Sequence, residues 1–420
     1  MKKEYIPRII DSYINESLKY SGAILIEGAK GCGKTRTAKE RSKSAVLMQD
    51  PEKSESYLKI AATKPALLLK GETPRLIDEW QLAPMLWNGV KYLVDERGEP
   101  GQFILTGSAS PPPDDTRHSG AGRFSRILMR PMSLFESGES NGMISLRQLF
   151  DHSADVGGIS ELSVEDMVSA IIRGGWPITI GEDERFATVF VKNYVDAVIN
   201  VDISSADGIK RNPVALFQLF RSLSRNISTT ASMSTLQRDM GEGINISDKT
   251  IVTYLDALRR IYIIEDLPAW NPSLRSSVAI RTSPKRHFVD PSIATSVLRA
   301  DKGNLLMDFN TLGFLFESLC IRDLRVYAQT LDGDVFHYRD ANGLEIDAII
   351  HLRDGRWGAI EIKMGTNEID KASRNLLKLK DYVDIDRMSP PSFLMVLTAG
   401  EFAYQMENGV MVIPIGCLKD

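Results

Sequence analysis

The feature that most constrains this chain is a glycine-rich segment placed between a short apolar run and a helical pattern. Residues 28–35 read Gly-Ala-Lys-Gly-Cys-Gly-Lys-Thr and match G-x-x-x-x-G-K-[ST] in full. The run Ala23–Glu27 is typical of a buried parallel strand, and we expect a helix from about Lys34 to Ser42. This order predicts a phosphate-binding loop, and the alternative is a chance glycine-rich turn.

In such a loop the glycines let backbone N–H groups close around phosphates, and the helix N-terminus adds a favourable dipole. We expect Lys34 to reach the β- and γ-phosphates and the Thr35 hydroxyl to ligate Mg²⁺. ATP is the expected nucleotide, although the motif does not separate ATP from GTP. The full set of predicted nucleotide-binding residues is Gly28, Ala29, Lys30, Gly31, Cys32, Gly33, Lys34, Thr35 and Arg36.

A second strand candidate, Arg75–Asp78, ends in adjacent carboxylates. Adjacent side chains at a strand end diverge, so Asp78 can hold the Mg²⁺ shell while Glu79 orients and polarises the attacking water. An isolated Asp-Glu pair would be an ordinary helix start. Its position after a strand, downstream of the phosphate-binding loop, favours a catalytic pair.

A third strand candidate, at residues 102–106, runs through Thr106 into Gly107 and Ser108. In P-loop ATPases of the AAA type the neighbouring strand places a polar residue beside the γ-phosphate, which would assign Thr106 or Ser108 as a sensor. The alternative is a strand that runs into a glycine turn.

Arg123 and Arg126 follow a polar Pro- and Gly-rich loop at residues 110–122. AAA-type domains carry at this place an arginine finger, which neutralises transition-state charge on a neighbouring subunit's nucleotide. The finger would imply a homo-oligomer, and the alternative is surface arginine.

Further segments extend the likeness: residues 76–81 (LIDEWQ), 130–136 (RPMSLFE), 254–258 (YLDAL), 288–291 (FVDP) and 313–317 (GFLFE). Together they resemble the AAA-type ATPases of bacteria and archaea that carry a long C-terminal domain of unknown function. The resemblance implies an α/β fold with an AAA-type P-loop ATPase core at residues 1–140 and a helical connector at 141–225. A winged helix at 226–290 and a restriction-endonuclease-like, PD-(D/E)xK-type α/β domain at 291–420 would follow.

The region around residues 234–260 predicts helix, turn, helix, with the turn at Gly241–Asn245. Apolar residues of the second helix repeat with helical spacing and predict one buried face: Ile251, Tyr254, Leu255 and Leu258. Lys249, Thr250 and Thr253 would then face outward.

Two basic stretches without acidic residues flank this region and favour contacts with DNA phosphates. Their cations are Arg211, Arg221, Arg225 and Arg238 in one, and Arg275, Arg281, Lys285 and Arg286 in the other. Winged helices also bind proteins, so a protein–protein module is the alternative.

Acidic residues also mark two strand candidates near the C-terminus, Glu345–Leu352 and Trp357–Lys363. A D…E-x-K set such as Asp347, Glu361 and Lys363 builds the restriction-endonuclease-type site. There Asp347 and Glu361 would hold Mg²⁺ or Mn²⁺, and Lys363 would act on the water. Glu317, on the preceding helix, matches a further metal-binding acid. The alternative is a strand with one solvated face, and the fold alone does not establish cleavage.

Composition excludes several other classes of protein. The formal charge is −4, from 51 Lys and Arg against 55 Asp and Glu, which excludes a uniformly basic nucleic-acid coat but not a local basic face. No apolar run reaches the ~18–20 residues of a membrane span, and we expect no secretory signal. The three cysteines lie far apart, which fits a reducing, cytoplasmic setting.

The chain is therefore predicted to hydrolyse ATP and to couple its nucleotide state to DNA binding, with metal-dependent DNA cleavage as a further activity. One alternative is a nucleotide-dependent switch whose C-terminal half is a catalytically inactive protein-interaction module. Another is a module that binds nucleotide without hydrolysing it.

Overall fold

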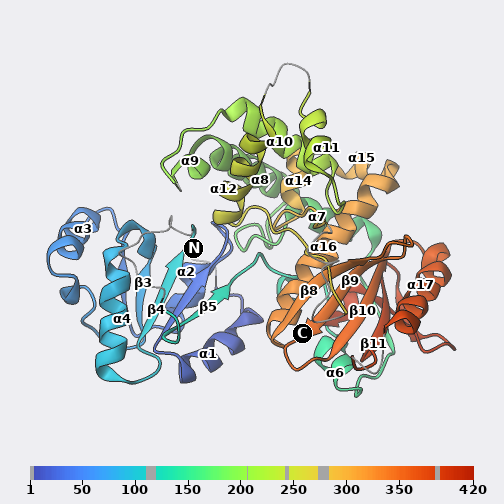
Figure 1. Cartoon of the computed structure of the whole chain (residues 1–420), viewed down its shortest axis with the longest axis horizontal. Coiled ribbons are helices and arrows are strands. Elements are labelled where there is room, and N and C mark those ends of the chain that lie inside the picture. Colours follow the sequence, from blue (N-terminus) through green and yellow to red (C-terminus); the bar gives the residue numbers. More distant parts are fainter. Residues whose placement is uncertain (1–3, 110–119, 206, 242–245, 273–282, 384–387) are drawn as a thin grey trace. The chain divides into compact units, whose positions relative to one another are not determined.

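The computed structural model describes residues 4–109, 120–205, 207–241, 246–272, 283–383 and 388–420. Most of the expected loop at 110–122, the turn residues 242–245, Arg275 and Arg281 therefore lie outside the described residues. The chain divides into two compact units (Figure 1). Unit 1 comprises Met1–Pro131, Val201–Arg211 and Asp256–Ile263, and unit 2 comprises Met132–Asn200, Asn212–Leu255 and Ile264–Asp420.

Unit 1 is built on a five-stranded parallel sheet of order β2-β3-β4-β1-β5 (Figure 1). Its strands are β1 (Ala23–Glu27), β2 (Ser44–Leu47), β3 (Arg75–Asp78), β4 (Phe103–Gly107) and β5 (Phe124–Leu128). The longer helices are α1 (Ile10–Tyr20), α2 (Lys34–Lys39), α3 (Ser54–Thr63) and α4 (Met85–Arg97). The expected strand–helix alternation is therefore present.

Both faces of this sheet are covered, which explains why its central strands are continuous apolar runs. Leu25 and Leu105 pack in a core with residues of α4, including Val90. Ile24 and Ile104 point to the opposite face and pack in a second core with residues of α1 and α2. The alternation of side chains along each strand therefore feeds two cores.

The strand order brings three carboxyl ends to one edge of the sheet. Ile26 of β1 lies opposite Thr106 of β4, and Asp78 is the last residue of β3. The connection after β1 leads to the far edge strand β2, whereas the connection after β4 leads to β5 on the other side of β1. Strands β1 and β4 therefore flank a topological switch point, where α/β sheets bind ligands.

Helices make up the first part of unit 2. They are α5 (Leu134–Ser137), α6 (Leu146–Phe150), α7 (Val164–Arg173), α8 (Glu184–Ala197), α10 (Pro213–Arg225), α11 (Met233–Asp239), α14 (Ser292–Leu298) and α15 (Lys302–Met307). The π-helical turn Val198–Asp202 and α9 (Ile203–Ser205) connect α8 to α10, and α12 (Asp248–Arg260) contributes residues to both units. Most of the region predicted as a helical connector, residues 141–225, is therefore helical.

Helices α11 and α12 correspond to the expected helix–turn–helix. The four apolar residues predicted to face inward on α12 are all buried, and Lys249 and Thr253 are exposed. After α12, two antiparallel bridges follow, Ile264↔Phe288 and Leu267↔Lys285. The helix faces agree with the spacing of the sequence, and the winged helix itself stays a prediction.

A seven-stranded mixed sheet of order β7-β12-β13-β11-β10-β9-β8 forms the rest of unit 2 (Figure 1). In that order the strands are Gly158–Ile159, Phe402–Gln405, Met411–Pro414, Phe393–Thr398, Trp357–Lys363, Glu345–Leu352 and Gly333–Arg339. Helix α16 (Phe309–Gln329) packs against β8, β9 and β10, and α17 (Ile369–Tyr382) packs against β9, β10 and β11. A separate parallel pair joins β6 (Ile144–Ser145) to β14 (Leu418–Lys419).

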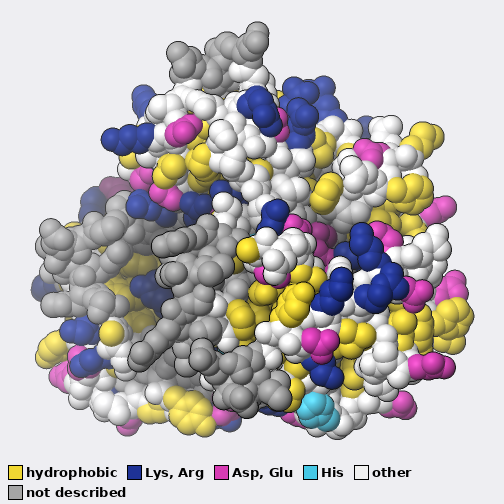
Figure 2. All heavy atoms as spheres, turned by 45° about the vertical axis from the view of Figure 1, so that its right-hand side comes forward, with side chains coloured by type: hydrophobic (Ala, Val, Ile, Leu, Met, Phe, Trp, Pro, Cys, Tyr) yellow, Lys and Arg dark blue, Asp and Glu magenta, His cyan; other side chains and the backbone are white. Residues whose placement is uncertain are grey.

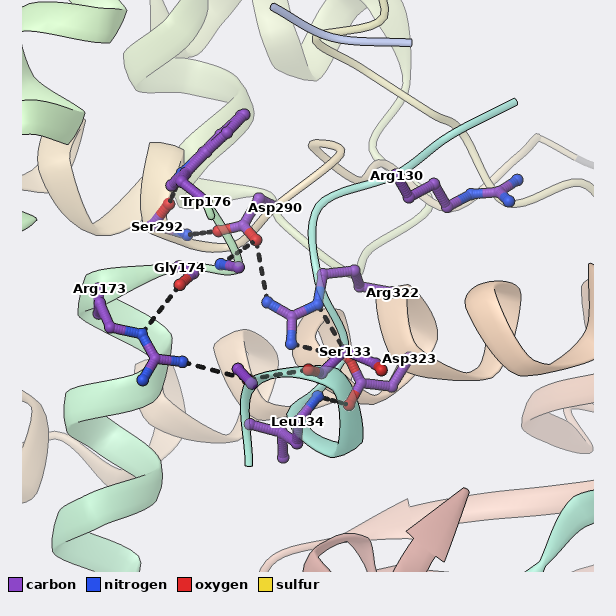
Figure 3. A network of polar contacts seen from close by, with 12 residues as sticks. Arg130, Ser133, Leu134, Arg173, Gly174, Trp176, Asp290, Ser292, Arg322 and Asp323 are labelled. Atoms are coloured by element: carbon purple, nitrogen blue, oxygen red, sulfur yellow. Dashed lines mark hydrogen bonds and ion pairs between the residues drawn. The ribbon is translucent and has the colours of Figure 1, made fainter. Parts of the chain in front are cut away.

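A buried polar network joins four segments of unit 2 (Figure 3). The Arg322 guanidinium of α16 lies 2.9 Å from Asp290 Oδ2 and 2.7 Å from Asp323 Oδ1. All three side chains are at most 3% exposed. Asp323 accepts a hydrogen bond from the backbone N–H of Leu134, and Asp290 accepts one from that of Gly175, both at 2.9 Å. The network therefore fixes the starts of α5 and of the turn after α7 against α16.

On the face drawn in Figure 2, Lys and Arg side chains gather in small groups with Asp and Glu between them. No helix in the described part of the chain is long and apolar enough to cross a membrane. Cys32, Cys320 and Cys417 are buried free thiols.

Candidate active site

The phosphate-binding loop has a backbone that only glycine adopts without strain at key positions. Gly28 has φ of 150°, and a Cβ placed on it would lie 2.1 Å from the carbonyl oxygen of Met129. Gly33 has φ of 107° and is the N-cap residue of α2. Side chains are therefore excluded where the loop turns into the helix, and the N–H groups of the first turn of α2 stay accessible.

Lys34 lies inside this loop. Its ammonium donates hydrogen bonds to the carbonyl oxygens of Gly28 and Ala29, each at 2.8 Å, and the residue is 5% exposed. A phosphate oxygen would accept from the same ammonium in a charge-assisted bond, which is stronger than a bond to a neutral carbonyl. The structure thus holds the lysine at the position where a β- or γ-phosphate would meet it.

Asp78, the last residue of β3, joins the loop to β4. Its Oδ1 accepts from the Thr35 hydroxyl at 2.7 Å and from the Thr106 hydroxyl at 2.6 Å. Asp78 is 7% exposed and Thr106 is fully buried. A hydroxyl and a carboxylate side by side form an oxygen donor set of the kind that Mg²⁺ prefers, with waters and phosphate oxygens completing the octahedron. Thr35 and Asp78 therefore fit the predicted metal.

Glu79 takes a different direction from Asp78. Its backbone is left-handed, with φ of 54°, which is uncommon for a residue with a side chain and typical of functional sites. Its Oε2 accepts from the Ser108 hydroxyl at 3.0 Å and from the Gln81 amide. The two neighbouring acids therefore have separate partners, one on the loop side and one at the end of β4.

Two residues that support this site were not assigned roles from the sequence. Arg8 is 6% exposed and donates to the backbone oxygens of Cys32 and Arg130, both at 2.8 Å, which ties the loop to the segment after β5. Gln81 bonds to Glu79 and, at 3.3 Å, to Ser108. A lone arginine ahead of the loop has no pattern to mark it, whereas Gln81 belongs to the segment 76–81 that carried the family resemblance.

The two arginines expected at a subunit boundary pair with acids of their own chain. Arg123 lies 2.8 Å from Asp95, and Arg126 on β5 lies 3.3 Å from Glu27 at the end of β1. Their side chains are 45% and 55% exposed. A second subunit could therefore contact both side chains. The arginine-finger role and the homo-oligomer stay predictions.

The two other basic residues assigned to nucleotide binding are exposed. Lys30, in the loop, lies 2.5 Å from Asp202, and Arg36 lies 3.0 Å from Glu40, the residue that follows α2. Neither Lys30 nor Arg36 takes part in the hydrogen bonds described above for Lys34, Thr35 and Asp78. Both side chains are exposed, whereas Lys34 is buried, and their role in nucleotide binding stays a prediction.

In unit 2 the structure brings the D…E-x-K residues together. The ammonium of Lys363 lies 2.8 Å from Asp347 Oδ2 and 2.7 Å from Glu361 Oε2. The backbone N–H of Ile362 also donates to Asp347 Oδ2, at 2.9 Å, and Asn375 of α17 donates to Glu361 Oε1 at 3.0 Å. Asp347 is therefore not an ordinary solvent-facing acid, and the strand alternation places Glu361 and Lys363 on one face as expected.

Glu317 reaches the same group through a residue that the sequence assigned elsewhere. Lys285, counted above among cations for DNA, is 7% exposed, and its ammonium lies 2.6 Å from Glu317 Oε1 and 3.2 Å from Asp347 Oδ1. We call Glu317, Asp347 and Glu361 with Lys285 and Lys363 the carboxylate cluster. The expectation that Lys285 contacts DNA phosphates is therefore wrong, because its side chain is buried among acids.

The electrostatics of the cluster follow from burial and from the two lysines. Burial raises the pKa of Glu317 to about 7, with the Lys285 charge opposing the rise. Burial and the charge of Asp347 raise the pKa of Glu361 to about 7. Burial alone would also raise the pKa of Asp347, but the ammonium groups of Lys285 and Lys363 hold it well below its usual range. Asp347 is thus the firmly ionised acid of the group.

A divalent ion does not fit this arrangement. Ammonium groups contact both carboxylate oxygens of Asp347, and one of these groups also contacts Glu317. Within the described part of the chain, no group of three or more His, Cys, Asp and Glu side chains is arranged to hold a metal ion. We therefore derive no chemical step through a metal at the carboxylate cluster.

Comparison with known proteins adds to this geometry. An AAA domain family matches residues 20–137, which include the phosphate-binding loop, the acid pair and Thr106. The chain contains an AAA-type P-loop ATPase domain. Two families described as domains of unknown function, DUF8612 and DUF4143, match residues 164–304 and 312–418.

Similar proteins match nearly the whole of this chain. Over 410 residues it is 23% identical to the uncharacterized protein Rv2008c of Mycobacterium tuberculosis and to the uncharacterized protein Mb2031c of Mycobacterium bovis. These matches span 96% of this chain and 82% of each relative. Among solved structures, the Walker-type ATPase PABY2304 of Pyrococcus abyssi matches 71% of this chain and 97% of its own, with 14% identity and a TM-score of 0.41. The ATPase assignment therefore rests on the domain match and on the site geometry.

Proposed function

We propose that this chain binds ATP with Mg²⁺ at the carboxyl edge of the unit 1 sheet and hydrolyses it. The observation that supports this most is the divergence of the two acids: Asp78 is held by Thr35 and Thr106, and Glu79 by Ser108 and Gln81. A module that only bound nucleotide would need the loop and its lysine but no second, separately oriented carboxylate.

Each residue has a role that its contacts support. Lys34 and the backbone N–H groups of the loop bind phosphate oxygens, and Thr35 and Asp78 would hold Mg²⁺, which stabilises negative charge on the β- and γ-phosphates. The Glu79 carboxylate accepts a proton from the attacking water and orients it. Ser108 and Gln81 fix that carboxylate by hydrogen bonds to its Oε2.

Replacement of Glu79 tests the proposal. Glu79→Gln keeps the shape of the side chain and the loop contacts but removes the base, so ATP hydrolysis should fall to background while ATP binding is kept. Phosphate release and fluorescent-nucleotide binding measure the two effects. Glu96→Gln, an exposed position on α4, is the matched control and should behave as wild type. Wild-type turnover in Glu79→Gln would rule out Glu79 as the base.

DNA is the second candidate partner, and exposed cations of unit 2 support it. Helices α10, α11 and α12 expose Arg221, Arg225, Arg238 and Lys249. Other cations of the two basic stretches are paired inside the chain: Arg211 lies 2.6 Å from Asp207, and Arg286 lies 2.9 Å from Asp266. The proposal is therefore DNA contact through α10–α12, in a winged-helix arrangement. DNA cleavage is left out because the carboxylate cluster does not fit a divalent ion.

A further inference from the structure

We infer that Lys285 is the built-in cation of the carboxylate cluster, and that the cluster binds no divalent ion while this lysine is in place. The resemblance implied Mg²⁺ or Mn²⁺ at Asp347 and Glu361. The chain itself supplies other partners for those acids: Lys285 and Lys363 contact Asp347, and Lys363 contacts Glu361. In unit 2 the nuclease-type residues Asp347, Glu361 and Lys363 would then form buried ion pairs that stabilise the fold.

The first step of the argument is the position of the lysine. Its Nζ bridges Glu317 Oε1 at 2.6 Å and Asp347 Oδ1 at 3.2 Å, which is the bridging place that a shared cation would take between two acids. Lys363 bridges Asp347 Oδ2 and Glu361 Oε2 in the same way. Each of the three carboxylates therefore already has an ammonium partner.

The second step is that Lys285 is anchored by its backbone. Its N–H donates to the carbonyl oxygen of Leu267 at 3.0 Å, and its carbonyl oxygen accepts from the N–H of Leu267 at 2.9 Å. The next residue, Arg286, forms an ion pair with Asp266 beside Leu267. Because both backbone groups of Lys285 are hydrogen-bonded, the direction of its side chain is set by the backbone. An exposed lysine on a surface, in contrast, could reach a nearby acid simply by changing its rotamer.

The third step is the charge balance. Three carboxylates and two ammonium groups leave a net charge of −1 when all are ionised. A divalent ion needs oxygen ligands at about 2.0–2.6 Å, so it would have to displace the Lys285 ammonium from both acids. The displaced ammonium would remain buried without a partner, beside a like charge, which is strongly unfavourable. Removal of the lysine charge therefore opens a site that the intact chain keeps closed.

A gain-of-binding experiment tests this inference. Mn²⁺ is titrated into the full chain without nucleotide, and free Mn²⁺ is followed by electron paramagnetic resonance. Lys285→Met should gain one Mn²⁺ per chain, bound at least tenfold more tightly than by wild type. Lys285→Met combined with Asp347→Asn should lose the gain, and Lys380→Met, at an exposed position of α17, should not show it.

Two results overturn the inference: Mn²⁺ binding by wild type that Asp347→Asn abolishes, or a folded Lys285→Met that gains no Mn²⁺. If Lys285→Met does not fold, the comparison of wild type with Asp347→Asn decides. Equal Mn²⁺ binding by these two supports the inference, and a loss in Asp347→Asn overturns it. ATP turnover has no part in this readout, so the outcome is independent of the proposed ATPase.

Discussion

Thr106 is the residue that links the two acids of the ATPase site. Its hydroxyl donates to Asp78 Oδ1 at 2.6 Å and accepts from the backbone N–H of Glu79 at 3.2 Å. One buried side chain therefore orients the carboxylate proposed to hold Mg²⁺ and bonds to the left-handed backbone of Glu79, the proposed base. Its described contacts are to the acids, which supports a positioning role beside the sensor role expected from the sequence.

Thr106→Val should lower ATP turnover about 10- to 100-fold, the usual range for loss of a group that orients a metal ligand, with a much smaller change in ATP affinity. The reason is that Asp78 keeps only the Thr35 hydroxyl. Steady-state phosphate release over a range of Mg²⁺ concentrations measures the effect. Thr63→Val, on an exposed position of α3, is the control. Turnover at the wild-type rate in Thr106→Val would contradict the positioning role.

At this scale, residues with a local pattern were predictable and residues with distant partners were not. Lys34, Thr35 and Asp78 stand in recognisable motifs, and the structure brings them together. Lys285 meets Glu317 and Asp347 at separations of 32 and 62 residues, so its partners depend on tertiary pairing that no local pattern encodes. A cation count along the chain could therefore not distinguish a buried lysine from a surface one.

Among the elements, α16 stands out because nearly all of its turns are buried. Its interior holds Arg322 and Asp323, polar residues that an apolar core tolerates only when paired. Burial raises the pKa of Asp323 to about 6, with Arg322 opposing the rise. The guanidinium therefore contacts two buried carboxylates, those of Asp290 and Asp323, inside unit 2.

Arg322→Met should lower the free energy of unfolding by about 3–5 kcal/mol at pH 7, because it leaves buried carboxylates without their counter-ion. Without Arg322 the folded-state pKa of Asp323 rises further above the unfolded value, so protonation relieves the cost and the loss should shrink between pH 7 and pH 5. Urea unfolding at both pH values measures this. Arg374→Met, exposed on α17, is the control, and a pH-independent loss would contradict the mechanism.

The success of element prediction followed the strength of the local signal. The alternating strands β9 and β10 have the bounds that were expected, residues 345–352 and 357–363. The sequence predicts a strand at Ile127–Met129, whereas β5 begins at Phe124, because its pairing with β1 extends over polar residues. The fully buried β11 (Phe393–Thr398) was not assigned, since a short apolar run alone does not separate strand from helix. The two-residue strands β6, β7 and β14 are defined only by their pairing with other strands, so no local pattern marks them.

For the whole molecule, neither unit is a continuous stretch of the chain. Unit 1 includes Val201–Arg211 and Asp256–Ile263 from regions that were assigned to the connector and the winged helix. A division of the sequence into four successive parts cannot assign later segments to an earlier unit. Changes in composition mark positions along the chain, and they do not show which segments pack together in space. The linear domain boundaries therefore stay predictions.

If α10–α12 contact DNA phosphates, affinity for a short duplex should fall steeply with salt, with a slope of about −0.9 in log K against log[salt] for each phosphate neutralised. Arg238→Glu with Lys249→Glu should weaken binding and make the slope shallower. The same reversal at Lys378 and Lys380 on α17 is the control for net charge. Fluorescence anisotropy at several salt concentrations measures both, and a flat salt response would favour a protein partner.

The β6–β14 pair has a consequence for the order in which a ribosome-bound chain can mature. Ser140 donates its hydroxyl to the carbonyl oxygen of Leu418, 278 residues later, and β6 pairs with β14 beside it. The sheet of the ATPase domain is complete once β5 has been made. Residues 140–159, in contrast, pair with β12 and β14, which are made much later than β5. The proposed nucleotide site can therefore form early, while unit 2 closes only after β14 has been made.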